Sequence, residues 1–470
     1  MAGEGQPAIE RLRAYLRELQ PGARALLISE LERTLLGGDN PAGAEMVLAE
    51  LRRGFRDGNA KSLRFGDPAR MFFQPLDPFL VDDIPDHKHH GRIARSTLEP
   101  MWLWLRNTLM PEEARAYSDQ VEQALVAGDT DNAEHLARDF QDRAAGRIAQ
   151  MLERLEKDDK ERRRLAAQLG SARAIETVRA PCAILGGREK LAALGSQLPA
   201  HINSLSGPLL NQVKALVDAP LAAKSGLFLY SLVLAMSRLA APWQLIRLAT
   251  KAAGGDVANR VAETPYAVAV NIVLEEIDRK VRELAGDLKS GRGVAVSALL
   301  KEIHDALRGM RSELDLSIES AWGRQLVAIR AEVSAFLTAE IELMPGRVRR
   351  LIRPRPSKEI ASGSVLDPDD VADAEALIGF VVTCRNYAGE LAINEVTQRT
   401  YNELREYLDT GTRTLLDALR NASPGERVFR QSQVDAAVRF CGKVFGGEYA
   451  SLLAKAAEVA SQGERKAARA

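Results

Sequence analysis

Aromatic residues are scarce in this chain, and cysteine is nearly absent. Only 5% of its 470 residues are aromatic, and runs of β-branched residues are few, which predicts little β-sheet. The three cysteines are far apart and match no metal or redox spacing: Cys182, Cys384 and Cys441. Such a set is typical of a reducing compartment, in which thiols pack as small hydrophobic side chains.

The chain also lacks a net charge, a secretory leader and a membrane-spanning run. Its 64 basic and 64 acidic residues cancel, so no overall field attracts it to nucleic acid or an anionic membrane. The N-terminus has no basic segment followed by an apolar core, which predicts a cytoplasmic protein.

The most apolar segment is residues 227–248. Its longest uncharged run has 11 residues, whereas a membrane-spanning helix needs about 20. We expect a buried core helix here, because a helix that is apolar nearly all round is typical of a bundle centre. Insertion at a membrane surface and docking of a partner helix are the alternatives.

Helix periodicity dominates the rest of the sequence. The clearest repeats are three heptad seams: Val270, Leu274, Ile277, Val281, Leu284 and Leu288; Val296, Leu300, Ile303, Leu307, Met310 and Leu314; and Trp322, Leu326, Ile329, Val333 and Phe336. The last two seams, residues 294–343, are compatible with one helix or with two. We therefore predict an elongated all-α protein with a central antiparallel bundle of the spectrin-like, coiled-coil type and a smaller helical subdomain at each end.

Helix breakers and charge runs predict the domain organisation. Pro345-Gly346 is expected to end the bundle, and Asp367-Pro368 to begin a new helix, with Asp367 as N-cap. The predicted parts are an N-terminal helical domain (1–130) that contains an irregular crossing (65–104), a long-helix bundle (131–345), a basic linker (346–366), a C-terminal helical domain (367–460) and a disordered tail (461–470).

The tip of the crossing carries the best metal-ligand candidates in the sequence. Three histidines and three aspartates fall within residues 82–90, and these ligand types suit zinc, nickel or iron. The candidate ligands are Asp86, His87, His89 and His90, and a divalent transition metal is the only cofactor that the sequence suggests. Their spacing matches no established metal motif, so a solvated polar loop is the alternative.

Two further sets of residues are candidate binding surfaces. Large rings contribute strongly at interfaces, and five lie in the crossing: Phe72, Phe73, Phe79, Trp102 and Trp104. They would bind a partner or, alternatively, pin the crossing to a helical core. Clustered guanidinium groups bind phosphates and anionic headgroups, and the linker provides Arg347, Arg349, Arg350, Arg353 and Arg355. The alternative is a solvated charge run.

Catalytic motifs are absent from the sequence. There is no Gly-x-Ser-x-Gly elbow, phosphate-binding loop, dinucleotide fingerprint or Glu-x-x-His pair. We therefore predict an intracellular helical scaffold or adaptor that binds a protein partner, with self-association through the heptad seams as one way of doing so. The alternatives are a metal-dependent activity at residues 82–90, and peripheral binding of nucleic acid or an anionic membrane surface through residues 347–358.

Overall fold

The structure is a computed structural model that describes residues 68–82, 90–155, 158–171, 173–223, 226–289 and 293–467. Within these ranges there are 17 α-helices and one small sheet, which confirms the all-α prediction. Most of the predicted N-terminal domain, residues 1–67, lies outside the described residues, as do the candidate metal ligands Asp86, His87 and His89.

The chain divides into two compact units, and each is described by itself. Unit 1 comprises residues 1–83 and 93–190, and unit 2 comprises residues 84–92 and 191–470. The predicted domain boundaries at residues 130, 345 and 366 stay predictions.

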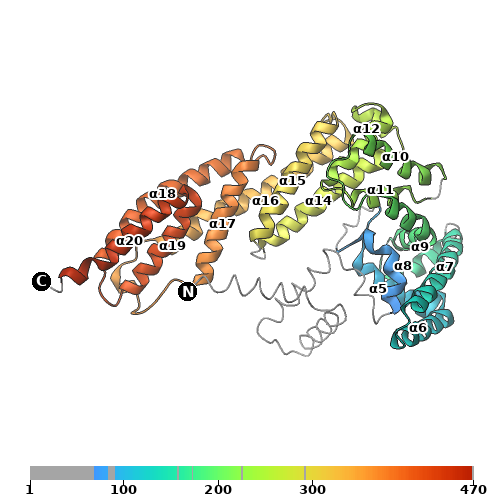
Figure 1. Ribbon diagram of the computed structural model, residues 1–470, viewed down its shortest axis with the longest axis horizontal. Coiled ribbons are helices and arrows are strands. Elements are labelled where there is room, and N and C mark those ends of the chain that lie inside the picture. Colours follow the sequence, from blue (N-terminus) through green and yellow to red (C-terminus); the bar gives the residue numbers. More distant parts are fainter. Residues whose placement is uncertain are drawn as a thin grey trace. The chain divides into compact units, whose positions relative to one another are not determined.

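Short helices and one pair of strands lead into the longer helices of unit 1 (Figure 1). Its elements are α4 (Pro68–Phe73), the 3₁₀-helix η2 (Gln74–Phe79), β1 (Leu80–Val81), β2 (Ile93–Ala94), the 3₁₀-helix η3 (Arg95–Thr97), α5 (Leu98–Trp104), the π-turn η4 (Leu105–Leu109), α6 (Pro111–Val126), α7 (Thr130–Leu155), α8 (Asp159–Leu169) and α9 (Ala174–Gln197), whose last residues belong to unit 2. The strands are parallel, with Leu80 opposite Ile93. Helix α4 packs on α6 and α7, and α6 packs along α7.

Unit 2 is built from helices throughout its described residues. Its elements are α10 (Gly207–Ala222), α11 (Phe228–Met236), the 3₁₀-helix η5 (Pro242–Leu245), α12 (Ile246–Ala253), α13 (Ala258–Ala262), α14 (Ala267–Lys289), α15 (Gly293–Glu313), α16 (Ala321–Ile352), the 3₁₀-helix η6 (Ser357–Glu359), α17 (Pro368–Tyr387), α18 (Asn394–Arg420), α19 (Arg427–Phe445) and α20 (Gly447–Ala467). The last of these extends past residue 461, where a disordered tail was expected.

The apolar segment 227–248 is core, as predicted, but it is not one helix. Helix α11 ends at Met236, and η5 begins at Pro242. Every residue from Tyr230 to Met236 is buried, because α11 is covered by α10, η5 and α14. None of the described helices combines the length and the apolar content that crossing a membrane requires.

The heptad seams form contacts inside the chain. Helix α14 packs on α15 and α16, and nearly all seam positions are buried. Residues 294–343 form two helices, because the chain leaves the helical path after Glu313 and re-enters it after Ser320, which caps α16 by accepting a hydrogen bond from the Gly323 amide. On α16 the seam departs from the prediction, because Leu337 is fully buried and Phe336 is half-buried.

The predicted helix end at Pro345 is wrong, because α16 continues to Ile352. Proline removes one backbone hydrogen bond from a helix interior. Here the helix persists because Ile341, Met344 and Val348 are fully buried on either side of the proline. The C-terminal part of α16 packs against α17, α18 and α19.

The segment that follows α16 is hydrogen-bonded to side chains of α19. Gln433 of α19 donates hydrogen bonds to the carbonyls of Leu351 and Arg353, at 3.0 and 2.9 Å. Arg430 donates to the carbonyl of Arg355 at 2.5 Å. The predicted start of α17 is confirmed, since the Asp367 side chain accepts a hydrogen bond from the Asp369 amide. Helices α17 to α20 then pack as a bundle on α16 (Figure 1).

Candidate functional site

The five rings proposed as a partner-binding surface belong to the core of unit 1. Phe72, Phe73, Phe79 and Trp104 are at most 4% exposed, and Trp102 is half-buried. The interface prediction for these rings is therefore wrong, and the alternative holds: they pin the crossing to the helices. The physical reason is that rings of this size release the most free energy when they leave water together.

Specific contacts hold this aromatic cluster. Phe72 lies 5.2 Å from the ring centroid of Phe140 on α7, and Tyr117 on α6 stacks on the same ring at 4.5 Å. The buried Gln141 donates a hydrogen bond of 2.9 Å to the Phe72 carbonyl, and the Tyr117 hydroxyl donates one of 2.9 Å to the Pro68 carbonyl. The cluster thus caps α4 as well as filling the core.

The predicted anion-binding arginines are mostly paired within unit 2. Three of them form ion pairs: Arg349 with Glu403, Arg350 with Asp370 and Arg353 with Glu359. The guanidinium group of Arg355 lies over the Phe429 ring. Arg347 is exposed. Exposed ion pairs contribute only about 0–1 kcal/mol. These contacts weaken the anion-binding prediction without contradicting it.

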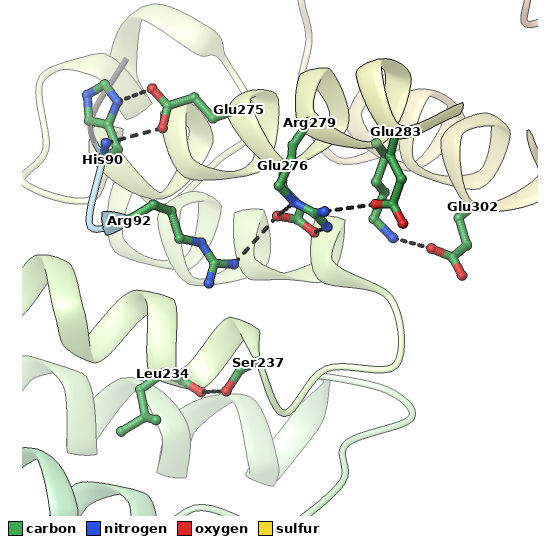
Figure 2. A network of polar contacts seen from close by, with 10 residues as sticks. His90, Arg92, Leu234, Ser237, Glu275, Glu276, Arg279, Glu283 and Glu302 are labelled. Carbon is green, nitrogen blue, oxygen red and sulfur yellow. Dashed lines mark hydrogen bonds and ion pairs between the residues drawn. The ribbon is translucent and has the colours of Figure 1, made fainter. Parts of the chain in front are cut away.

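One member of the histidine cluster, His90, is described, and it is anchored to α14. Its backbone amide donates to Glu275 Oε2 at 3.2 Å, and its Nδ1 contacts Glu275 Oε1 (Figure 2). Two residues later, Arg92 Nη2 lies 3.5 Å from Glu276 Oε2. Between them, Gly91 adopts a φ of +72° and packs against Val233 and Leu229 of α11. We call residues 90–92 with Glu275 and Glu276 the α14 anchor.

The carboxylate of Glu276 is the most enclosed charge of the α14 anchor. Arg279 donates to both of its oxygens, at 2.7 and 3.1 Å. Burial by itself raises the pKa of Glu276, but the hydrogen bonds and charge of Arg279 and the charges of Arg92 and Lys280 outweigh it and lower the pKa. Burial has the opposite effect on a cation and lowers the pKa of the Arg92 guanidinium. The carboxylate is therefore held in its ionised form.

The ion pairs continue along α14 and onto α15. Arg279 also donates to Glu283 at 2.9 Å, and Lys280 pairs with Glu302 of α15 (Figure 2). Each of the four carboxylates in this network contacts an arginine, a lysine or His90. Its chemistry suits holding segments together rather than catalysis.

His90 retains one group that could act on a ligand. Because Nδ1 is engaged by Glu275, the other ring nitrogen, Nε2, is the atom that remains for coordination, and the side chain is 37% exposed. A carboxylate on one nitrogen is the usual arrangement behind a metal-binding histidine. No group of three or more metal-ligating side chains occurs among the residues described.

The second candidate site is the outward face of α16, which the sequence reasoning missed. Small and apolar side chains are exposed along it for about six helical turns, and they are Ala321, Val327, Ala328, Ala331, Ala335, Ala339 and Leu343. The two large ones, Val327 and Leu343, are 47% and 49% exposed. The exposed charges on this side of α16 are Arg324, Glu332 and Glu342, and Glu332 lies between the alanines. We call this surface the α16 outer face.

A sequence signal for the α16 outer face exists. The alanines at 321, 328 and 335 repeat every seven residues, and Ala321 and Ala328 each lie about 100° around the helix from the next residue, the buried Trp322 and Ile329. Such a repeat of small residues predicts a second packing face. The α14 anchor has no comparable signal, because Glu275 and His90 are 185 residues apart.

In comparisons with known proteins, no protein-family model, no curated protein and no solved structure matches this chain. Its function is therefore argued from the α16 outer face and the α14 anchor.

Proposed function

We propose that this protein is a helical scaffold that binds a protein partner, and that the α16 outer face is its binding surface. The supporting observation is the exposure of Val327 and Leu343 on either side of a continuous run of alanines. A contiguous apolar strip on an exposed helix face is a feature of many interaction sites. A helix face of small residues admits a partner helix at close range, because interaxial distances of 8–10 Å depend on the side chains at the contact.

Photo-crosslinking tests the proposal. The photoreactive residue p-benzoylphenylalanine replaces Ala335 in the full chain, and the protein is irradiated in the cells that normally produce it. A matched control replaces Ala372, an exposed alanine of α17 beside Asp370 and Asp373. We expect a discrete polypeptide adduct from position 335 and none from position 372. Equal labelling from both positions, or no adduct from either, would contradict the proposal.

The finer architecture is part of the same proposal. A spectrin-like antiparallel arrangement of the central helices is supported by the packing of α14 on both α15 and α16 and by the burial of their heptad positions. Cytoplasmic residence is supported by the three reduced cysteines, of which Cys384 and Cys441 are buried.

Metal binding at the histidine cluster is the second candidate function, and the Glu275–His90 contact favours it. The Glu275 carboxylate fixes the ring orientation of His90. The function would then be metal-dependent, with Glu275 as a residue that positions the ligand rather than as a ligand itself.

Zinc titration by calorimetry on the full chain, without an affinity tag, tests this candidate. If His90 is a ligand, Glu275→Gln should weaken zinc binding about 10–100-fold, and His90→Ala should weaken it at least as much. His201→Ala is the matched control, because His201 is an exposed histidine whose ring bonds only to Asn203 among the described contacts. No zinc binding by the wild type, or equal affinity in all four proteins, would remove the metal proposal.

A further inference from the structure

We propose that the partner on the α16 outer face is a second copy of this chain, with the two α16 helices antiparallel. This inference rests on the proposed function and names its partner. It differs from self-association through the heptad seams, because the seam residues are buried within their own chain. The alanines of the outer face are exposed, whereas the side of α16 that packs on the other helices is buried, and Glu342 at the edge of the face pairs with Arg399 of α18.

The positions of two charges carry the argument. Arg324 and Glu342 are 18 residues apart, which is five turns at 3.6 residues per turn, so they project from the same side of the helix, about 27 Å apart. Both are exposed. The midpoint between them is residue 333. An antiparallel pair with its two-fold axis at this level places Arg324 of one copy opposite Glu342 of the other, twice.

The same axis matches the small residues. It places Ala331 of one copy level with Ala335 of the other, and Ala328 close to Ala339. With methyl groups at each of these levels, the two backbones approach closely enough for van der Waals contact along the whole run. A two-fold axis also makes every contact occur twice, which is the usual symmetry of a homodimer.

The charges also select against other arrangements. A parallel, in-register pair would set Arg324 against Arg324 and Glu342 against Glu342 of the second copy, and like charges in contact are strongly unfavourable. The antiparallel pair brings opposite charges together at both ends, and it brings the exposed Glu332 of each copy close to the two-fold axis. Within one chain, Glu342 Oε1 already accepts a hydrogen bond from Arg399 at 2.6 Å. A carboxylate has two oxygens, so Oε2 can accept from Arg324 of the second copy.

The size of the contact sets the expected strength. Between residues 324 and 342 the paired helices run about 27 Å at 1.5 Å per residue. A strip about 10 Å wide on each copy then buries roughly 550 Å² in all, which is below the ~1,200 Å² of stable interfaces. We expect a weak dimer that forms and dissociates reversibly, and whose population depends on protein concentration.

A charge-reversal experiment by sedimentation velocity tests the pairing and its direction. The full-length wild type should self-associate as its concentration is raised. Arg324→Glu alone places two acids at each end of the pair, and Glu342→Arg alone places two bases there, so each should weaken self-association at least about tenfold. An equimolar mixture of the two variants restores opposite charges at both ends and should dimerise about as well as the wild type.

Controls separate the pairing from effects on folding. Arg308→Glu reverses an exposed arginine on α15, away from the outer face, and should leave self-association unchanged. Glu342→Arg also brings an arginine near Arg399, so Glu342→Gln is included, which removes the attraction without adding repulsion and should weaken association less than Glu342→Arg. Thermal melting of each variant verifies that it folds.

Two results would overturn the inference: a wild type that stays monomeric throughout the concentration series, or a mixture that associates no better than either variant alone. The proposed function fails separately. If the wild type is monomeric but position 335 crosslinks to a different polypeptide, the scaffold proposal holds and the self-pairing is wrong. If position 335 yields an adduct between two copies of the chain, both hold.

Discussion

Replacing Glu276 by glutamine tests whether the α14 anchor stabilises unit 2. Glutamine keeps the shape of the side chain but removes its charge. Arg279 then loses one of the two oxygens to which it donates at 2.7 and 3.1 Å, and the amide NH₂ that replaces this oxygen faces a guanidinium group. Arg92, whose side chain is 20% exposed, keeps its buried positive charge and loses a counter-ion at 3.5 Å.

The magnitude follows from the degree of burial. Removing one partner of a fully buried ion pair destabilises a protein by about 3–5 kcal/mol, because the other charge stays buried. Glu276 is 11% exposed, but Arg279 is 34% exposed, so water screens part of this loss. We therefore expect Glu276→Gln to destabilise unit 2 around α14 by about 2 kcal/mol, a value between that of a buried pair and that of a surface pair.

Amide hydrogen exchange measured by mass spectrometry on peptides from α14 is the assay. A loss of about 2 kcal/mol in the free energy of opening corresponds to roughly 30-fold faster exchange. Glu283→Gln is the matched control, because Glu283 also pairs with Arg279 but is 45% exposed and should change the free energy by at most about 0.5 kcal/mol. If the two variants exchange at the same rate, Glu276 is not part of a buried anchor.

The difference in stability between the wild type and Glu276→Gln should also depend on pH. The pKa of Glu276 is lowered in the folded state, so its stabilising contribution is complete above the ordinary carboxyl pKa of 4.5. It is lost as the pH falls from there through the folded-state pKa, because the wild-type carboxylate then becomes protonated. The difference between wild type and Glu276→Gln should therefore shrink below pH 4.5. A difference that stays constant at acid pH would contradict this role of the charge.

Three further substitutions probe packing and capping. Gly91→Ala puts a methyl group 2.7 Å from Val233 Cγ2 on a backbone with a φ of +72°, and should speed exchange in α11 through a loss of about 2–3 kcal/mol. Gly309→Ala puts its new methyl group 2.6 Å from Cε2 and 2.7 Å from Cε3 of the Trp243 ring. Overpacking of this kind costs about 1–3 kcal/mol, so we expect a lower Tm and altered tryptophan fluorescence. Gln433→Leu leaves two backbone carbonyls at the end of α16 unpaired and should lower the free energy of unfolding in urea by about 1–3 kcal/mol for each.

Each of these substitutions has a matched control. Gly128→Ala has a φ of +75° but nothing within 4 Å, so it reports backbone strain alone and should cost less than Gly91→Ala. Gly286→Ala lies in α14 with open space around it and should stabilise by up to about 1 kcal/mol. Gln431→Leu changes a half-buried glutamine two residues from Gln433 that bonds to Asp435 within α19, and it should have little effect. Equal effects within any pair would refute the contact on which that prediction depends.

Local patterns predicted the helices and most of their buried faces. The seam from Val296 to Leu314 is buried at every position, and Asp367 caps α17 as expected, because periodicity and capping depend only on neighbours a few residues away. Pro345 shows the limit of this reasoning. Its local preference is to end a helix, yet α16 passes through it, because burial against three other helices outweighs one lost hydrogen bond.

By itself, the sequence determined the all-α class, the buried position of residues 227–248 and the heptad faces of α14, α15 and α16. Tertiary structure alone decided that the aromatic residues of the crossing are core, that His90 is anchored to Glu275, and that no described helix covers the outer face of α16. The physical reason is the separation along the chain over which each effect acts. Helix propensity and periodicity act within a few residues, whereas exposure and ionic partners depend on which distant elements pack together.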